Sequence, residues 1–279
     1  MTKDVAVILP CIRPQNLVKV YNSIQEACKG YSFEVLIPSP YTIPDEILKK
    51  ENVKYFHTYT SPTIACQMAI QLANARFLYN MTDDGLVQNQ AISLAIQLHQ
   101  QHGLTNKDVI NMIYREAVLN CDTLEIENVS QIDAFPSYYW LAVAHEVMRL
   151  PGISPNWRIA LHFFMDTDYF LQLGGYDCRY ETLNHAIHDL MFRVQTDGGR
   201  LADLPVPAFY CSHIPGTHRD HKPIVDGQMG PDLTLFNSVY SKPNPIEQVN
   251  IKYNNWKHHP TVWERRFDKN NLSLLPLTY

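Results

Sequence analysis

Short β-branched runs alternate with stretches of helical periodicity through the first 114 residues of this 279-residue chain. The runs at 4–10, 33–37 and 53–56 have the length and composition of buried strands. Apolar residues at helical spacing lie between them, as in the stretch 16–27. A chain that alternates in this way folds into a mainly parallel, doubly wound sheet. We therefore expect an α/β fold in which helices flank the sheet.

The same pattern predicts the order of the remaining elements. Further strands are expected at 77–81, 108–114 and 206–210, and helices at 16–27, 44–50, 62–75 and 90–101. The segment from about 120 to 155 is not predicted well. Its aromatic run 135–140 is typical of core packing, and the alternative is a surface that stacks on sugar rings.

The apolar run that begins at Phe77 ends abruptly in two adjacent acids and a glycine, Asp83-Asp84-Gly85. Open α/β sheets bind ligands at the carboxyl ends of their strands, so we expect these carboxylates in a cleft. Neighbouring carboxylates repel each other, and a divalent cation such as Mg²⁺ or Mn²⁺ relieves that repulsion and can hold a diphosphate. The alternative is a surface turn, because Asp and Gly are favoured in turns.

Four short motifs follow one another between residues 4 and 215. They are an opening strand with its loop, the acidic strand end, a Gly-Gly-aromatic-Asp turn and a His-Asp pair, at 7–14, 81–85, 173–177 and 188–194. In order and separation they resemble the inverting family 2 glycosyltransferases of the GT-A fold. Those enzymes move a sugar from a nucleotide diphosphate sugar to an acceptor. The resemblance implies a GT-A-like domain over 1–222 and a C-terminal extension, 223–279, packed on or near the active site.

The resemblance also implies roles for residues of the first two motifs. Asp84 takes the position of the metal-binding acid, which would hold Mn²⁺ or Mg²⁺. Asp83 beside it would contact the ribose or the second coordination shell. Pro10 and Arg13 belong to the loop that would bind the nucleotide diphosphate sugar.

The chain departs from the family pattern at three places. Thr82 replaces the first acid of the usual Asp-x-Asp arrangement, and 38–40 reads Pro-Ser-Pro where an Asp near the nucleotide base is typical. Cys66-Gln67 replaces a common Arg-Asn pair. The base specificity is therefore not implied. These departures favour the alternative of a non-catalytic module that binds a nucleotide or a sugar.

Inverting transfer needs a base that takes the proton of the acceptor hydroxyl. The family places a Glu-Asp pair at a helix start for this purpose, and here the pair reads His188-Asp189, so the resemblance makes Asp189 the candidate base. His188 would orient it, contact the acceptor or act as the base itself. The alternative for Asp189 is a helix cap, which satisfies free backbone amides whatever the function. Asp177 is expected to face the acceptor or simply to form its turn.

A Gly- and Pro-punctuated loop at 211–222 gathers three histidines and two cations. Such a loop suits closure over a diphosphate, whose growing charge an Arg and a Lys would stabilise. The resemblance makes His213 a candidate metal ligand, with Arg219 and Lys222 on the phosphates. A zinc site is the weaker alternative, because Cys211 forms no paired-ligand spacing.

Composition limits the function classes. A net charge of −5 gives no basic field for nucleic acid, and no apolar run is long enough to cross a bilayer. Six scattered cysteines and the absence of a signal peptide indicate reduced thiols and a cytoplasmic protein. The polar segment beyond 223 is compatible with a partner or with peripheral membrane contact.

The resemblance therefore implies a metal-dependent, inverting glycosyltransferase of the hexosyltransferase type. Its donor is a nucleotide diphosphate sugar, and its acceptor, a hydroxyl of a carbohydrate, a lipid-linked molecule or a protein, is not identified. A nucleotidyltransferase is the less favoured enzyme class, because the loop after the first strand lacks a Gly-rich phosphate motif.

Overall fold

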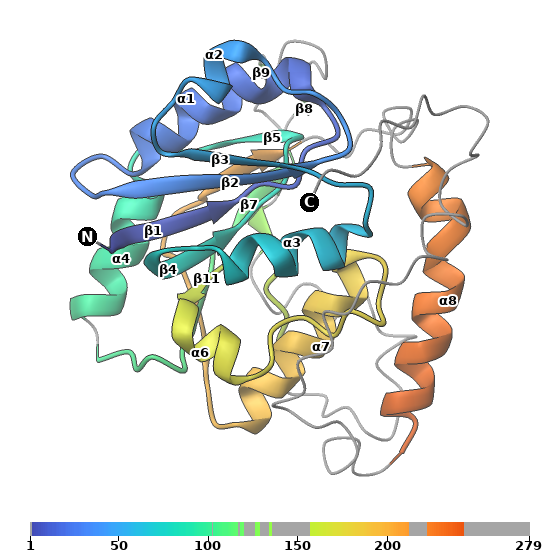
Figure 1. Cartoon of the computed structure of the whole chain (residues 1–279). Helices are drawn as coiled ribbons and strands as arrows, with labels where there is room; N and C mark the ends of the chain where they lie inside the picture. The colour runs from blue at the N-terminus through green and yellow to red at the C-terminus, as the bar shows by residue number, and fades with distance from the viewer. Residues whose placement is uncertain are drawn as a thin grey trace.

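The structure of the chain, a computed structural model, describes residues 2–101, 103–116, 118–119, 126–128, 134–135, 157–211 and 222–242 (Figure 1). For 116, 118–119, 126–128, 134–135, 211 and 222–230 it describes the backbone alone. The predicted α/β fold, with a mainly parallel sheet flanked by helices, is confirmed.

The central sheet has seven strands in the order β12-β6-β11-β4-β1-β2-β3. Strands β1, β2, β3 and β4 are parallel neighbours, and β12 is parallel to β6. Strand β11 lies antiparallel between β4 and β6. The bounds are Lys3–Ile8 (β1), Phe33–Ser39 (β2), Val53–His57 (β3), Ala75–Asn80 (β4), Val109–Asn111 (β6), Phe163–Asp166 (β11) and Leu201–Asp203 (β12).

The helices cover both faces of this sheet (Figure 1). They are Pro14–Asn16 (η1, a 3-10 turn), Leu17–Ala27 (α1), Asp45–Leu48 (α2), Pro62–Gln71 (α3), Ala91–Gln101 (α4), Thr167–Gln172 (α6), Leu183–Thr196 (α7) and Lys222–Tyr240 (α8). The predicted apolar face of α1 is confirmed, because its members at helical spacing are buried.

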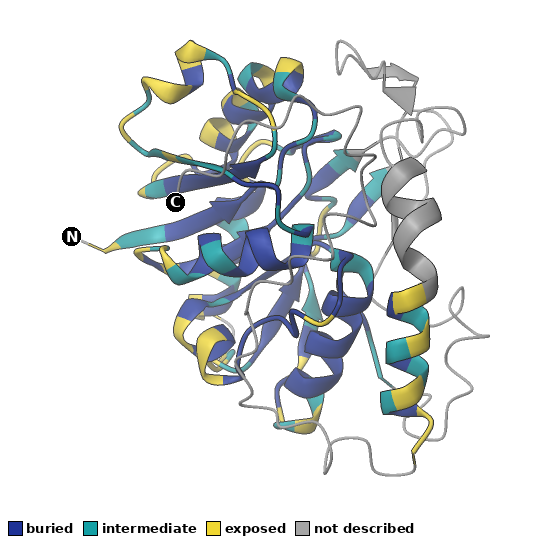
Figure 2. Ribbon diagram, turned by 45° about the vertical axis from the view of Figure 1, so that its right-hand side comes forward, coloured by how far each residue is buried: buried dark blue, intermediate teal, exposed yellow. Residues whose placement is uncertain are grey.

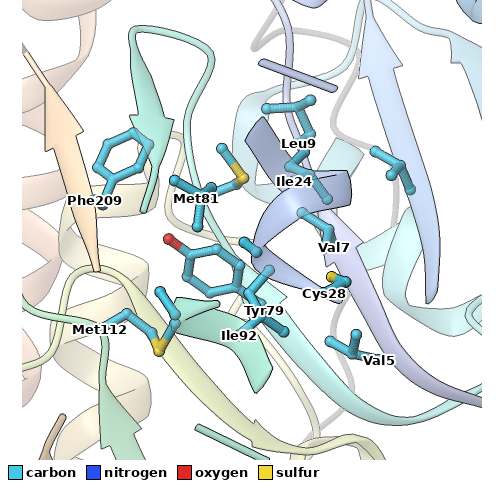
Figure 3. Close-up of a cluster of buried hydrophobic side chains, with 14 of the residues drawn as sticks. Val5, Val7, Leu9, Ile24, Cys28, Tyr79, Met81, Ile92, Met112 and Phe209 are labelled. Atoms are coloured by element: carbon cyan, nitrogen blue, oxygen red, sulfur yellow. The ribbon is translucent and has the colours of Figure 1, made fainter. Parts of the chain in front are cut away.

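Alternate residues of β1 point to opposite faces and so begin two cores. Val5 and Val7 pack with α1 and α4, whereas Ala6 and Ile8 pack with α3, α6 and α7. Figure 3 shows part of the first core, in which Tyr79 of β4 and Met81 lie between Val7 of β1 on one side and Phe209 on the other. The central strands are almost entirely buried, as Figure 2 shows. This burial explains their near-continuous apolar sequences.

A second sheet has four strands in the order β10-β7-β13-β5. Its strands are Gly85–Val87 (β5), Tyr114–Glu116 (β7), Ala134–Phe135 (β10) and Phe209–Cys211 (β13), and a separate ribbon pairs Val118–Leu119 (β8) with Ile126–Asn128 (β9). The single strand predicted at 108–114 is therefore wrong. The chain bends at Met112 and Ile113, whose backbone groups bond His162 and Ala208, so its two halves join different sheets.

Three other expectations need correction. The helix predicted to reach residue 75 ends at Gln71, because Lys3 bonds the carbonyl of Asn74 and β4 begins at Ala75 to match β1. The strand predicted at 206–210 is shifted to Phe209–Cys211. Gly85 is the first residue of β5 rather than part of a free surface turn. The boundary after residue 222 stays a prediction.

Candidate active site

The acidic strand end lies beside the loop after β1, because β1 and β4 are parallel neighbours whose carboxyl ends meet. The Asp83 carboxylate, 2% exposed, accepts hydrogen bonds from the backbone N–H of Ile12 (2.7 Å) and of Arg13 (2.6 Å). It also forms a buried ion pair with the Arg13 guanidinium at 2.7 Å. Two of the predicted motifs are thus joined by one side chain.

Burial raises the pKa of Asp83, and the Arg13 guanidinium and the two N–H donors oppose that rise. Both carboxylate oxygens are engaged by this loop. The geometry therefore gives Asp83 the role of fixing the loop against the strand end. Its predicted contact with ribose stays a prediction.

Asp84, the next residue, is half-buried. The Thr82 hydroxyl donates a hydrogen bond to Asp84 Oδ1. Thr82, which stands where the family pattern has an acid, therefore orients the neighbouring carboxylate. Pro10 is half-buried in the loop after β1.

These residues fit a hard cation in one respect. Mg²⁺ in nucleotide sites uses one or two protein carboxylates and takes its other ligands from phosphates and water. Asp84 at the strand end supplies such a carboxylate. In the part of the chain that the structure describes, no group of three His, Cys, Asp or Glu side chains is placed to hold a metal ion.

The Gly-Gly turn is built around left-handed backbone. Gly174 and Gly175 have φ of 92° and 69°, a conformation that favours glycine. A Cβ on Gly175 would collide with the Gln67 amide, lying 2.5 Å from its Nε2. Gln67 Oε1 accepts from the Tyr176 N–H at 2.8 Å, and the Tyr176 hydroxyl donates to Asn80 Oδ1 at 3.1 Å. Gln67, one of the departures from the family pattern, thus joins this turn to α3, and Tyr176 joins it to β4.

Asp177 follows this turn and is buried. It pairs with the side chain of Arg179, whose Nε lies 3.0 Å from both carboxylate oxygens, and accepts from the Arg179 backbone N–H. The turn role of Asp177 is therefore visible, and its contact with an acceptor stays a prediction.

The expectation that Asp189 lies at a helix start is wrong. Helix α7 begins at Leu183 after the N-cap residue Thr182, so Asp189 sits almost two turns inside it and caps nothing. Its carboxylate, 1% exposed, accepts from Arg193 Nε at 2.8 Å and from the Tyr240 hydroxyl at 2.9 Å. Burial raises the pKa of Asp189, and Arg193 opposes the rise.

His188 is also buried, and its ring contacts those of His185 and Phe236. Burial lowers the pKa of His188 to about 3, and the neighbouring His185 adds to this effect. A general base works best when its pKa lies near the operating pH. His188 in this setting is a neutral ring and a weak proton acceptor.

Several residues of this region were not singled out by sequence reasoning. Asp232 of α8 accepts from the N–H groups of Glu181 and Thr182 and from the Thr182 hydroxyl, all within 2.8 Å. Tyr240 of the same helix reaches Asp189. The only sequence signal for such contacts was the i,i+4 spacing of Asp189 and Arg193. No local sequence pattern indicates that Asp232 or Tyr240 makes these contacts.

The predicted closing loop lies mostly outside the described residues. His213 and Arg219 fall there, and Lys222 is described only as the first backbone position of α8. Their roles stay predictions.

No family model and no curated protein matches the sequence. Solved structures do show a likeness, and two of them are of S. aureus TarS, residues 1–349, alone and in complex with UDP-GlcNAc. Their TM-scores are 0.48 and 0.49 at 15% identity, and the aligned part covers 79% and 76% of this chain. This chain spans about three fifths of those chains, 63% and 59%. The likeness is one of fold.

Among the helices of the described part, none has the length and apolar character needed to cross a membrane.

Proposed function

We propose that this chain transfers a sugar from a nucleotide diphosphate sugar to an acceptor hydroxyl, with inversion and with a divalent metal ion. The observation that carries the proposal is the junction of Asp83 with Ile12 and Arg13. It holds the loop after β1 at the end of β4, so that Asp84 stands where open α/β sheets bind their ligands. The order of the four sequence motifs supports the same reaction class.

In this proposal Asp84 holds Mn²⁺ or Mg²⁺, and His213 adds a second ligand. The bound metal would neutralise charge on the leaving diphosphate. Arg219 and Lys222 would bind the same phosphates, and Pro10 and Arg13 would line the nucleotide site. The Thr82 hydroxyl keeps the Asp84 carboxylate in one orientation.

The acceptor side receives less support from the geometry. A base must have an oxygen free to approach the acceptor hydroxyl, at about 2.6–3.2 Å. Both oxygens of Asp189 are engaged, one by Arg193 and one by Tyr240. The carboxylate is also 1% exposed, so Asp189 could act as the base only after a rearrangement that opens it to the acceptor.

The proposal is tested by thermal denaturation with UDP-, GDP-, dTDP- and CMP-linked sugars, each with Mn²⁺, Mg²⁺ or EDTA. UDP-GlcNAc, the ligand in the TarS complex, comes first. A ligand that binds only the folded state at 100 times its Kd stabilises it by about 2.7 kcal/mol. We expect such a shift for one nucleotide class, lost with EDTA and in Asp84→Asn. The control Glu46→Gln removes an exposed acid at the start of α2 and should retain the shift.

A non-catalytic module that binds a nucleotide sugar is the second candidate, and the engaged Asp189 carboxylate favours it. The two are separated by incubating the protein with the donor that stabilises it and a panel of acceptors. Release of nucleoside diphosphate supports the transferase. Tight metal-dependent binding without release, over long incubation, supports the module.

A further inference from the structure

We infer that Asp189 is a positioning residue: it orients Arg193, which fixes the Gly174-Gly175 turn against the acidic strand end, and Tyr240 of α8 holds it in place. The inference deepens the proposed function and rests on it, since the strand end is the proposed metal and donor site. It replaces the base role that the sequence suggested for Asp189.

The first step is the set of contacts made by Arg193, which is 2% exposed. Its Nε donates to Asp189 Oδ2 at 2.8 Å, its Nη1 to the carbonyl of Leu173 at 2.9 Å and its Nη2 to the carbonyl of Gly175 at 2.6 Å. All three guanidinium nitrogens are therefore used. The planar fork of arginine suits this arrangement, and a lysine ammonium cannot reproduce it.

The second step is the role of the carboxylate. A buried guanidinium is costly unless a counter-charge accompanies it. Asp189, four residues before Arg193 on α7, supplies that charge and fixes the plane of the guanidinium through Nε. The two nitrogens that remain then point at the two carbonyls of the turn.

The third step leads from the turn to the strand end. Gly175 adopts left-handed backbone and presents the next residue, Tyr176, to Gln67 and Asn80. Asn80 is the last residue of β4. Asp84 follows it by four positions, so the turn held by Arg193 braces the segment that carries the proposed metal ligand.

The fourth step is the contribution of α8. The Tyr240 hydroxyl donates to Asp189 Oδ1, and the Tyr240 ring packs on Phe236 and Phe192, with centroids 4.6 and 5.3 Å away. Asp232, earlier in α8, accepts hydrogen bonds from Thr182, the N-cap residue of α7, so α8 also bonds the start of α7. Helix α8 lies beside α7 at the edge of the molecule (Figure 1). Residues beyond 222 thereby complete the buried network that Asp189 and Arg193 form.

Backbone hydrogen exchange tests the inference without reliance on activity. Arg193→Lys keeps a positive charge for Asp189 but loses the two carbonyl contacts. We expect about tenfold faster exchange at 173–177 and also at 80–85. Asp189→Asn should give the same pattern. The matched control, Asp232→Asn, weakens the hydrogen bonds between α8 and the residues just before α7, and it should accelerate exchange only around 181–184. If Arg193→Lys and Asp189→Asn change exchange only within α7, the inference is wrong.

Kinetics with the stabilising donor give the second test. If Asp189 is a positioning residue, Asp189→Asn should lower kcat by about 100-fold, because the groups at the strand end would be misplaced. The donor KM should change little. The acid limb of the pH–rate profile should stay, and the double variant with Arg193→Lys should be no slower than the slower single variant.

Two results would contradict the positioning role. Loss of the acid limb in Asp189→Asn, with additive effects in the double variant, would show that Asp189 is the general base. Wild-type kcat at temperatures where Asp189→Asn stays folded would reduce it to a stability role. Failure of the proposed function looks different: the wild-type protein would bind no donor, while the exchange results would still decide the network.

Discussion

Acidification should destabilise the protein through His188, and the size of the effect follows from its burial. The folded-state pKa of His188 is lowered from 6.5 to about 3 by desolvation and by His185. Below pH 6.5 the unfolded chain therefore binds a proton that the folded chain does not bind. The stabilisation is complete above that pH and is lost progressively as the pH falls toward 3.

The magnitude comes from the two titration curves. Lowering the pH from about 7.5 to about 5.5 raises the total of neutral and protonated unfolded histidine, relative to the neutral form, by about tenfold. The folded histidine stays neutral over the same range. His188 alone should then cost about 1.4 kcal/mol of unfolding free energy. His185, whose pKa burial also lowers while Asp232 opposes the change, acts in the same direction.

Urea denaturation at both pH values measures the effect in the wild-type protein and in His188→Gln. The quantity of interest is the change with pH, since the substitution itself alters the packing against Phe236. The variant should lose about 1.4 kcal/mol less than the wild type on acidification. An equal loss in both proteins would show that His188 already accepts a proton in the folded state, and the reasoning from its burial would be refuted.

Three further tests of the geometry use urea denaturation, two of them with a second variant for comparison. Asp83→Asn should cost about 3–5 kcal/mol because it removes one side of the buried Asp83–Arg13 ion pair. Lys107→Gln, in a pair whose side chains are 45% and 28% exposed, should cost less than about 1 kcal/mol, and similar costs would contradict the burial argument. Gly85→Ala would press a Cβ on the Tyr210 carbonyl and within 2.5 Å of the Phe209 ring, and we expect a loss of about 2–3 kcal/mol. Gly175→Ala should be destabilising by about 2 kcal/mol, from left-handed strain and the displaced Gln67 amide, and a Gln67→Ala background should recover part of that loss.

The sequence predicted the parallel half of the central sheet well. Apart from η1 and β5, the strands and helices from β1 to α4 were expected within a few residues of where they lie, because each depends on local apolar periodicity. Strands β11 and β12 were not predicted. Each has only three or four residues, and β11 pairs with β4 and β6, which are distant in the sequence.

Part of the candidate site could also be located from the sequence, and the rest required the structure. The acidic strand end could be located from the sequence, since it follows a recognisable strand, and the same holds for the loop after β1. That Asp83 is engaged by Arg13, and that Thr82 orients Asp84, required coordinates. Both contacts depend on side-chain directions that no spacing rule specifies.

The His-Asp pair shows most clearly what only the tertiary structure decided. The residues 188 and 189 looked like a helix start because a motif gives order along the chain, not depth in a helix. Folding places Asp189 inside α7, beneath a tyrosine from α8 that lies 51 positions away. The sequence alone determined the α/β class and the acidic strand end, because local patterns encode burial. The partners of the buried charges were decided by packing, because these contacts join segments whose separation the sequence does not constrain.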